Sequence, residues 1–126
     1  DNTVIMVSSD HGAGFRFEGE LDSCQPLRGH KRTMYEGGIR VPTIVRWNSQ
    51  IPKEQVSNHP WYFPDIMPTL LDLADLPVPK DIDGVSIAPT LKNRGEQKQH
   101  HHLYWALPLY DFGKRQFRPE LSKHNA

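Results

Sequence analysis

The sequence lacks long hydrophobic runs, an excess of charge of either sign, and all but one cysteine. Apolar runs such as residues 4–7 are far shorter than the roughly 20 apolar residues of a membrane-spanning helix. The 15 Lys and Arg residues balance the 15 Asp and Glu residues, so the net charge favours neither nucleic acid nor an anionic membrane surface as a partner. Cys24 stands alone, which excludes an internal disulfide framework and leaves the redox compartment open.

The first residues also lack the charged and then apolar pattern of a signal peptide. The chain opens directly on the apolar, β-branched segment "TVIMVSS" and ends on the polar segment "RPELSKHNA". An initial strand of this kind needs pairing partners that 126 residues barely supply. We therefore expect the sequence to be a fragment of a longer protein.

Two apolar segments in the first half predict strands. Residues 3–8 form an almost continuous apolar run, which is typical of a strand buried on both faces. Residues 39–47, "IRVPTIVRW", predict a second strand, and Pro42 places it at an edge or a bulge. Residues 12–38 between them show little periodicity and predict a long loop, a feature that in compact domains usually serves function or is disordered.

The second half predicts helices followed by β structure. In "PDIMPTLLDLADLPVP", apolar residues recur at three- and four-residue spacing, which predicts an amphipathic helix packed on a sheet. Pro64 and Asp65 suit its first turn, and Pro77 and Pro79 are expected to end it. The segment "DGVSIAPTLKN" predicts a turn and a short helix, and "HHLYWALPLYDFGKRQF" predicts a strand or the start of a hairpin.

Asp10 and His11 follow the first predicted strand directly. In an open α/β sheet, ligands bind beyond the carboxyl ends of the strands. A carboxylate in that place can ligate a hard cation, and an imidazole can ligate a metal or donate to an anion. An ordinary turn is the alternative interpretation, because Asp and Gly both favour turns.

Lys31 lies in the long loop beside three more potential cations, Arg28, His30 and Arg32. Such a cluster can neutralise an anion such as sulfate or phosphate. A solvated basic turn is the alternative and the commoner meaning of such a cluster. Glu36, which precedes two glycines, is expected to anchor the loop by accepting backbone N–H bonds rather than to act in acid–base catalysis.

The run of histidines at residues 100–102 is a poor candidate for a metal site. Successive side chains on an extended chain point to opposite faces, so the three imidazoles cannot converge on one ion. We therefore expect no ligand-binding role for this run.

Several segments in order carry a family resemblance: "DNTVIMVSSDHG", "PLRGHKRTMYEGGIRVPTIVRW", "PDIMPTLLDLADLPVPKDIDGVSIAPTL" and "HLYWAL". They resemble the C-terminal part of arylsulfatase-type, formylglycine-dependent sulfatases of the alkaline phosphatase superfamily. The resemblance runs from residue 1 to about residue 118. It implies an α/β fold, with part of a sheet flanked by helices in residues 1–95 and the incomplete start of a small C-terminal antiparallel sheet domain in residues 96–126.

The same resemblance implies a chemistry and a set of roles. The family cleaves sulfate esters with a formylglycine hydrate that attacks sulfur, while a calcium ion holds the sulfate oxygens. Asp10 matches a calcium-ligating aspartate, and His11 falls where members have a further ligand or a substrate contact. Lys31 matches the catalytic lysine that contacts the sulfate and assists the leaving group, and Arg28 is expected to contribute to substrate binding in the same loop.

Cys24 lies in the order Cys-x-Pro-x-Arg, which is the minimal signal for oxidation to formylglycine. In the family that signal lies well before the calcium-site aspartate, whereas Cys24 follows Asp10. The fuller signal also departs at Leu27, Lys31 and Met34. We therefore expect the nucleophile to lie upstream, Cys24 to be an ordinary loop residue, and this chain alone to be inactive.

Two other functions remain open at this point. A phosphonate monoester or phosphodiester hydrolase of the same superfamily would also carry Asp-His-Gly after a strand, and a non-catalytic anion- or metal-binding remnant would share every residue discussed. The resemblance favours a sulfatase acting on a sulfated small molecule or glycan, with no nucleic-acid partner and no membrane span. It also implies a periplasmic, secreted or lysosomal location.

Overall fold

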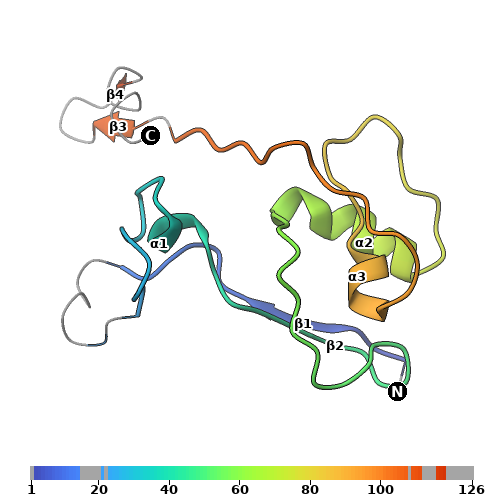
Figure 1. The fold of residues 1–126 in the computed structure, drawn as a ribbon. Coiled ribbons are helices and arrows are strands. Elements are labelled where there is room, and N and C mark those ends of the chain that lie inside the picture. The colour runs from blue at the N-terminus through green and yellow to red at the C-terminus, as the bar shows by residue number, and fades with distance from the viewer. Residues whose placement is uncertain (1, 15–20, 22, 108, 112–115, 119–126) are drawn as a thin grey trace. The chain divides into compact units, whose positions relative to one another are not determined.

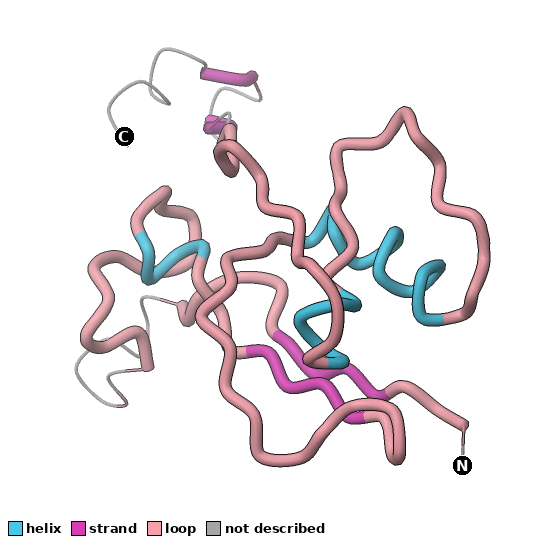
Figure 2. The backbone as a smooth tube through the Cα atoms, turned by 45° about the vertical axis from the view of Figure 1, so that its right-hand side comes forward, coloured by secondary structure: helices cyan, strands magenta, loops and turns pink. Residues whose placement is uncertain are grey.

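The computed structural model describes residues 2–14, 21, 23–107, 109–111 and 116–118. Loops make up most of this part of the chain (Figure 2). The regular elements are short and follow one another in the order shown in Figure 1: β1 (Ile5–Ser8), α1 (Glu36–Ile39), β2 (Thr43–Arg46), the 3₁₀ turn η2 (Phe63–Asp65), α2 (Ile66–Leu73), α3 (Ala88–Lys92), β3 (Leu109–Asp111) and β4 (Gln116–Arg118).

The chain divides into two compact units that are described separately. Unit 1 comprises Asp1–Met6 and Val45–Leu103, and it holds α2 and α3. Unit 2 comprises Val7–Ile44 and Tyr104–Ala126, and it holds the long loop with α1. The predicted domain boundary between residues 95 and 96 stays a prediction.

β1 confirms the first predicted strand but not its expected burial. β1 and β2 are neighbours in a two-stranded sheet, and the Ser8 hydroxyl lies 3.0 Å from the Thr43 hydroxyl. Ile5 and Val7 are 53% and 59% exposed. Ile5 and Val7 share one face of β1, and that face is exposed, whereas Met6 on the other face is half-buried.

The second predicted strand is half wrong. Its last part, β2, is extended, but Ile39 ends the short helix α1 instead of starting a strand. The amides of Gly37 and Gly38 donate to the carbonyls of Arg28 and Tyr35, so these backbone groups are used inside the loop and not in a sheet. Strand pairing then begins immediately after Pro42, which has no N–H to donate.

α2 confirms the predicted helix, although its end has a different cause from the one expected. Its last turn closes with Leu76 N–H donating to the Leu71 carbonyl at 2.9 Å and Asp75 N–H donating to the Asp72 carbonyl at 3.2 Å. Asp75 is left-handed, with φ of 54°. This is a Schellman ending, so the helix stops before Pro77 is reached.

α3 confirms the predicted short helix and packs with α2 (Figure 1). It ends at Asn93, which adopts the left-handed conformation that asparagine tolerates well. The buried hydrophobic residues of the described chain are few: Leu73, Ile87 and Ala88. They lie in α2 and at the start of α3, so the core is concentrated in unit 1.

β3 and β4 pair antiparallel, with Tyr110 opposite Phe117. This confirms the predicted hairpin and a small antiparallel sheet near the end of the described chain. The predicted polar segment after Arg118 lies outside the described residues. None of the helices in the described part is long and apolar enough to cross a membrane.

Candidate functional site

The Asp10–His11 pair lies just beyond the carboxyl end of β1 in unit 2. His11 Nε2 is 3.0 Å from Asp10 Oδ2, and His11 Nδ1 is 2.9 Å from the Gly12 carbonyl oxygen. Both partners are acceptors, so the ring satisfies both at once only when each nitrogen carries a proton. The Asp10 side chain is 80% exposed. Both ring nitrogens are therefore engaged within the segment, while the Asp10 carboxylate is open to solvent.

The loop that carries Lys31 is bonded to this segment through the backbone. Lys31 N–H donates to the Ala13 carbonyl at 2.8 Å, and Gly12 N–H donates to the Gly38 carbonyl at 3.0 Å. The two predicted site segments, which are separate in the sequence, are thus joined within one unit. These contacts join backbones, so the roles expected of the Asp10 and Lys31 side chains stay predictions.

Glycine makes this close approach possible. A Cβ at Gly12 would lie 1.7 Å from the Gly37 carbonyl oxygen, and a Cβ at Gly37 would lie 2.1 Å from the Gly29 carbonyl oxygen. A Cβ at Gly38 would lie 2.2 Å from the Thr33 carbonyl oxygen. Real side chains do not reach such distances from a backbone oxygen. Gly12 is therefore needed where its segment meets the Lys31 loop, and Gly37 and Gly38 are needed where that loop closes on itself.

Inside the loop, a turn sets the backbone on either side of Lys31. Thr33 N–H and its hydroxyl both donate to the His30 carbonyl, at 3.0 and 2.7 Å. His30 Nδ1 donates to the Lys31 carbonyl at 2.8 Å. Arg32, the next residue, is left-handed with φ of 71° and is exposed. The Lys31 side chain is half-buried and has no ion-pair partner within the described residues.

Arg28 closes the base of the same loop. Its guanidinium carbon lies 4.1 Å from the centre of the Tyr35 ring, and its carbonyl accepts the Gly37 N–H at 2.7 Å.

The expectation that the Glu36 side chain anchors the loop is wrong. Its carboxylate is 59% exposed and pairs with Arg40 one turn later at 3.3 Å. The anchoring expected of Glu36 comes instead from the glycine amides that follow it.

Cys24 is half-buried, and its thiol donates to the Gly37 carbonyl at 3.4 Å. It therefore packs against the base of the Lys31 loop as a loop residue. The expectation that it is not converted to formylglycine stays a prediction, because no contact in the structure bears on that chemistry.

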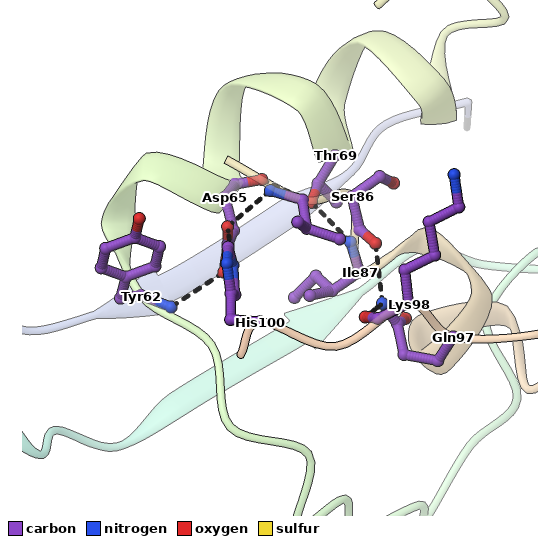
Figure 3. Close-up of polar contacts among 9 residues, drawn as sticks. Tyr62, Asp65, Thr69, Ser86, Ile87, Gln97, Lys98 and His100 are labelled. Atoms are coloured by element: carbon purple, nitrogen blue, oxygen red, sulfur yellow. Dashed lines mark hydrogen bonds and ion pairs between the residues drawn. The ribbon is translucent and has the colours of Figure 1, made fainter. Parts of the chain in front are cut away.

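A second Asp–His pair, which the sequence did not reveal, lies in unit 1 (Figure 3). Asp65 is fully buried, and its Oδ1 accepts from His100 Nε2 at 2.8 Å and from Val85 N–H at 2.7 Å. Its Oδ2 accepts the Tyr62 N–H at 3.0 Å. One carboxylate thus ties the start of α2 to two later segments of the chain.

Thr69 continues this network one turn further along α2 (Figure 3). Its hydroxyl donates to the Asp65 carbonyl at 2.6 Å and accepts the Ile87 N–H at 2.9 Å. The Tyr62 ring meets the His100 ring edge to face at 5.0 Å between centres. Burial raises the pKa of the Tyr62 phenol above its ordinary value, and the nearby carboxylates of Asp65 and Asp83 add to the rise.

This second pair was missed for an identifiable reason. His100 belongs to the histidine run for which we expected no ligand-binding role, and the Asp65 side chain was assigned to the first turn of a helix. The two residues are 35 positions apart, so no local pattern links them. The one available signal was the Asp at the start of an apolar helix, where a carboxylate can accept a backbone N–H.

The described residues do not form a complete metal site. They contain no group of three or more His, Cys, Asp or Glu side chains that could hold an ion. Calcium takes six to eight oxygen ligands, and the predicted pair offers one carboxylate. A calcium-ligating role for Asp10 therefore stays a prediction.

Comparison with known proteins places the chain in a family. Residues 29–120 match the family described as N-sulphoglucosamine sulphohydrolase, C-terminal. The chain is 35% identical over 115 residues to the steryl-sulfatase of Mus musculus, an alignment that covers 86% of this chain and 18% of that protein. It is 34% identical over 122 residues to an N-acetylglucosamine-6-O-sulfatase of Bacteroides thetaiotaomicron, covering 93% of this chain and 20% of that protein.

A solved structure agrees with these relatives. A crystal structure from Bacteroides thetaiotaomicron, provisionally assigned as a sulfatase, superposes with a TM-score of 0.58 at 31% identity, covering 78% of this chain and 20% of that one. The chain thus spans about a fifth of the length of the curated relatives it matches. The matched family region, the relatives and the shared fold together show that the chain belongs to the sulfatases.

Proposed function

We propose that this chain forms the C-terminal part of a sulfuric ester hydrolase and supplies its catalytic lysine. The observation that carries the proposal is the backbone junction between the Lys31 loop and the Asp10–His11 segment, at 2.8 and 3.0 Å. This junction brings a cation, an imidazole and a carboxylate from separate segments into one unit. The match to the sulfatase family supports sulfate over other anions.

Lys31 is proposed to act on the leaving group. When a sulfate ester is cleaved, the S–O bond breaks and negative charge moves to the bridging oxygen. An ammonium beside that oxygen interacts more strongly with the transition state than with the ground state, so it raises the rate of the chemical step. The half-buried position of the Lys31 side chain suits this role, because partial exclusion of water strengthens the interaction.

His11 is proposed to contact the bound sulfate, and Asp10 to give one carboxylate ligand to a calcium ion. Arg28 is proposed to contribute to substrate binding from the base of the Lys31 loop, without contacting the anion itself. Calcium, when bound, would hold sulfate oxygens and offset their charge. Ligation of the metal stays the second proposed role of His11. Both ring nitrogens of His11 have partners within the segment, Asp10 and the Gly12 carbonyl, so either role requires one of these contacts to be exchanged.

The wider protein is proposed to follow the family. Its sheet would be flanked by helices as in alkaline phosphatase-like enzymes, residues 1–95 would belong to that catalytic domain, and residues 96–126 would begin the C-terminal sheet. A sulfated carbohydrate is the proposed substrate class, which the similarity to an N-acetylglucosamine-6-O-sulfatase supports. The formylglycine nucleophile would come from upstream, and the protein would act in a periplasmic, secreted or lysosomal compartment.

The test compares two esters in the full-length protein. The protein is co-expressed with a formylglycine-generating enzyme and assayed on 4-nitrophenyl sulfate and on bis(4-nitrophenyl) phosphate. We expect hydrolysis of the sulfate ester, unchanged in Cys24→Ser. Preferred hydrolysis of the phosphodiester would replace the proposal with a phosphoryl hydrolase. Loss of activity in Cys24→Ser, with a mass change at the Cys24 peptide, would show that the nucleophile had been misplaced.

A further inference from the structure

Arg28 contacts the far side of the Lys31 loop with both its backbone and its side chain. Its carbonyl accepts the Gly37 N–H at 2.7 Å, and its guanidinium lies over the Tyr35 ring at 4.1 Å. Residues 28 and 35 flank Lys31 in the sequence, so these contacts close the loop at its base. A guanidinium over the face of a tyrosine ring is held by the ring quadrupole.

We propose that Arg28 is a positioning residue, which acts by stacking on Tyr35 to set where Lys31 lies, and not a direct ligand of the sulfate. The proposal rests on the proposed function, since it concerns the lysine of that site. It assigns Tyr35 a role for the first time, because the Tyr35 ring is the surface on which Arg28 is held.

The geometry of the loop explains why such a closure matters. Gly29 and Arg32 are both left-handed, with φ of 84° and 71°, so the backbone turns sharply on each side of Lys31. The tip of the loop, at Lys31, is bonded to the neighbouring segment, because the Lys31 N–H donates to the Ala13 carbonyl. The base is held by Arg28. Releasing the base lets the tip shift, and a shift of about 1 Å in a catalytic group can cost a large factor in rate.

The first experiment is a double-mutant cycle on kcat in the full-length enzyme with 4-nitrophenyl sulfate. The variants are Arg28→Met, Tyr35→Leu and the two combined, with Tyr35→Phe as the control that keeps the ring. Because an exposed cation–π contact is weak, each single change is expected to lower kcat by about two- to fivefold. The double variant should lose no more than one single variant, and Tyr35→Phe should match the wild type. Additive losses in the double variant would overturn the proposal.

The second experiment measures inhibition by inorganic sulfate. If Arg28 only positions Lys31, Arg28→Met and Tyr35→Leu should weaken sulfate binding by the same small factor. If Arg28 binds the anion directly, Arg28→Met alone should weaken it by about 10- to 100-fold, the loss expected for a charge-assisted hydrogen bond, and the proposal would be wrong.

A third readout needs no catalysis and so separates this inference from the proposed function. The Gly37 amide donates to Arg28, so its hydrogen exchange reports closure of the loop base. We expect faster exchange at Gly37 in Arg28→Met and in Tyr35→Leu, and wild-type exchange in Tyr35→Phe. Unchanged exchange in both disruptive variants would refute the positioning role, whether or not the protein hydrolyses sulfate esters.

Discussion

The described residues include two Asp–His pairs of opposite character. Asp10 and His11 are adjacent in sequence, with side chains 80% and 35% exposed, and they lie beside the loop of the catalytic lysine candidate. Asp65 and His100 are far apart in sequence, with side chains 0% and 12% exposed, and they join separate segments of unit 1. The same two residue types therefore serve different ends, and burial decides which.

The difference follows from the cost of burying charge. A carboxylate taken out of water must be met by donors, and Asp65 is met by two backbone amides and an imidazole. Satisfied in this way and fully buried, it holds the structure together and is closed to a ligand. The Asp10 side chain is largely exposed and so stays accessible from solvent. Stability should therefore depend on the buried pair, and activity on the region of the exposed pair.

Replacing Asp65 tests the buried side of the comparison and should have the largest effect on stability. Asp65→Ala leaves the amides of Tyr62 and Val85 without their acceptor and removes the partner of His100. We expect a loss of about 3–5 kcal/mol in the free energy of unfolding, measured by denaturant titration of the full-length protein. Asp10→Ala is the matched control and should change it by less than about 0.5 kcal/mol. Equal losses of stability in the two variants would show that burial does not separate the roles of the two pairs.

Replacing Lys31 tests the exposed side. Lys31→Ala in the full-length enzyme should lower kcat by about 10²–10³, the loss typical of removing one preorganised electrostatic donor. Lys31→Arg should rescue little, because a planar guanidinium does not fit the place of a compact ammonium. Arg32→Ala, in which an exposed neighbouring cation is lost, should retain most of the activity. A change confined to KM in Lys31→Ala would make Lys31 a binding residue only.

A pair of glycines tests whether the site region depends on close backbone approach. Gly12→Ala places a Cβ 1.7 Å from the Gly37 carbonyl oxygen, whereas a Cβ at Gly14 meets nothing within 4 Å. We expect Gly12→Ala to destabilise the protein by about 1–3 kcal/mol, as overpacking does, and to lower activity as well. Gly14→Ala should leave both properties near the wild type. The measurements are thermal unfolding and kcat of the two variants. Wild-type stability and kcat in Gly12→Ala would show that the two loops do not meet as described.

The smallest expected effect is at the end of α2, where a substitution should raise the stability of the protein instead of lowering it. Asp75 is left-handed at the Schellman ending, with φ of 54°, a conformation that costs a residue other than glycine some strain. Asp75→Gly should raise the free energy of unfolding by about 0.5–1 kcal/mol. Asn93→Gly, at the corresponding place after α3, should gain less because asparagine is the residue that most often replaces glycine at this helix-end position. A loss of stability in Asp75→Gly would mean that the Asp75 side chain contributes contacts beyond the cap.

Local pattern predicted those parts of the fold that local physics controls. The spacing of apolar residues predicted α2, the segment with Ala-Pro-Thr-Leu predicted α3, and the aromatic stretch near the end predicted the β3–β4 hairpin. The prediction failed at Ile39, where a β-prone residue ends a helix because the two glycines before it are bonded into the loop. It also failed for the burial of β1, because burial depends on neighbours and not on the strand's own residues.

The order of the motifs in the sequence was enough to determine the family and to single out Asp10, His11, Arg28 and Lys31 as candidates, because each motif is a run of consecutive residues. Only the tertiary structure showed that the Lys31 loop is bonded to the segment after β1, that Arg28 lies on Tyr35, and that Asp65 and His100 form a buried pair. These facts arise from chain closure between distant positions. For the backbone junction and the buried pair, the cause is the need of every buried polar group for a partner, and a sequence does not state where that partner lies.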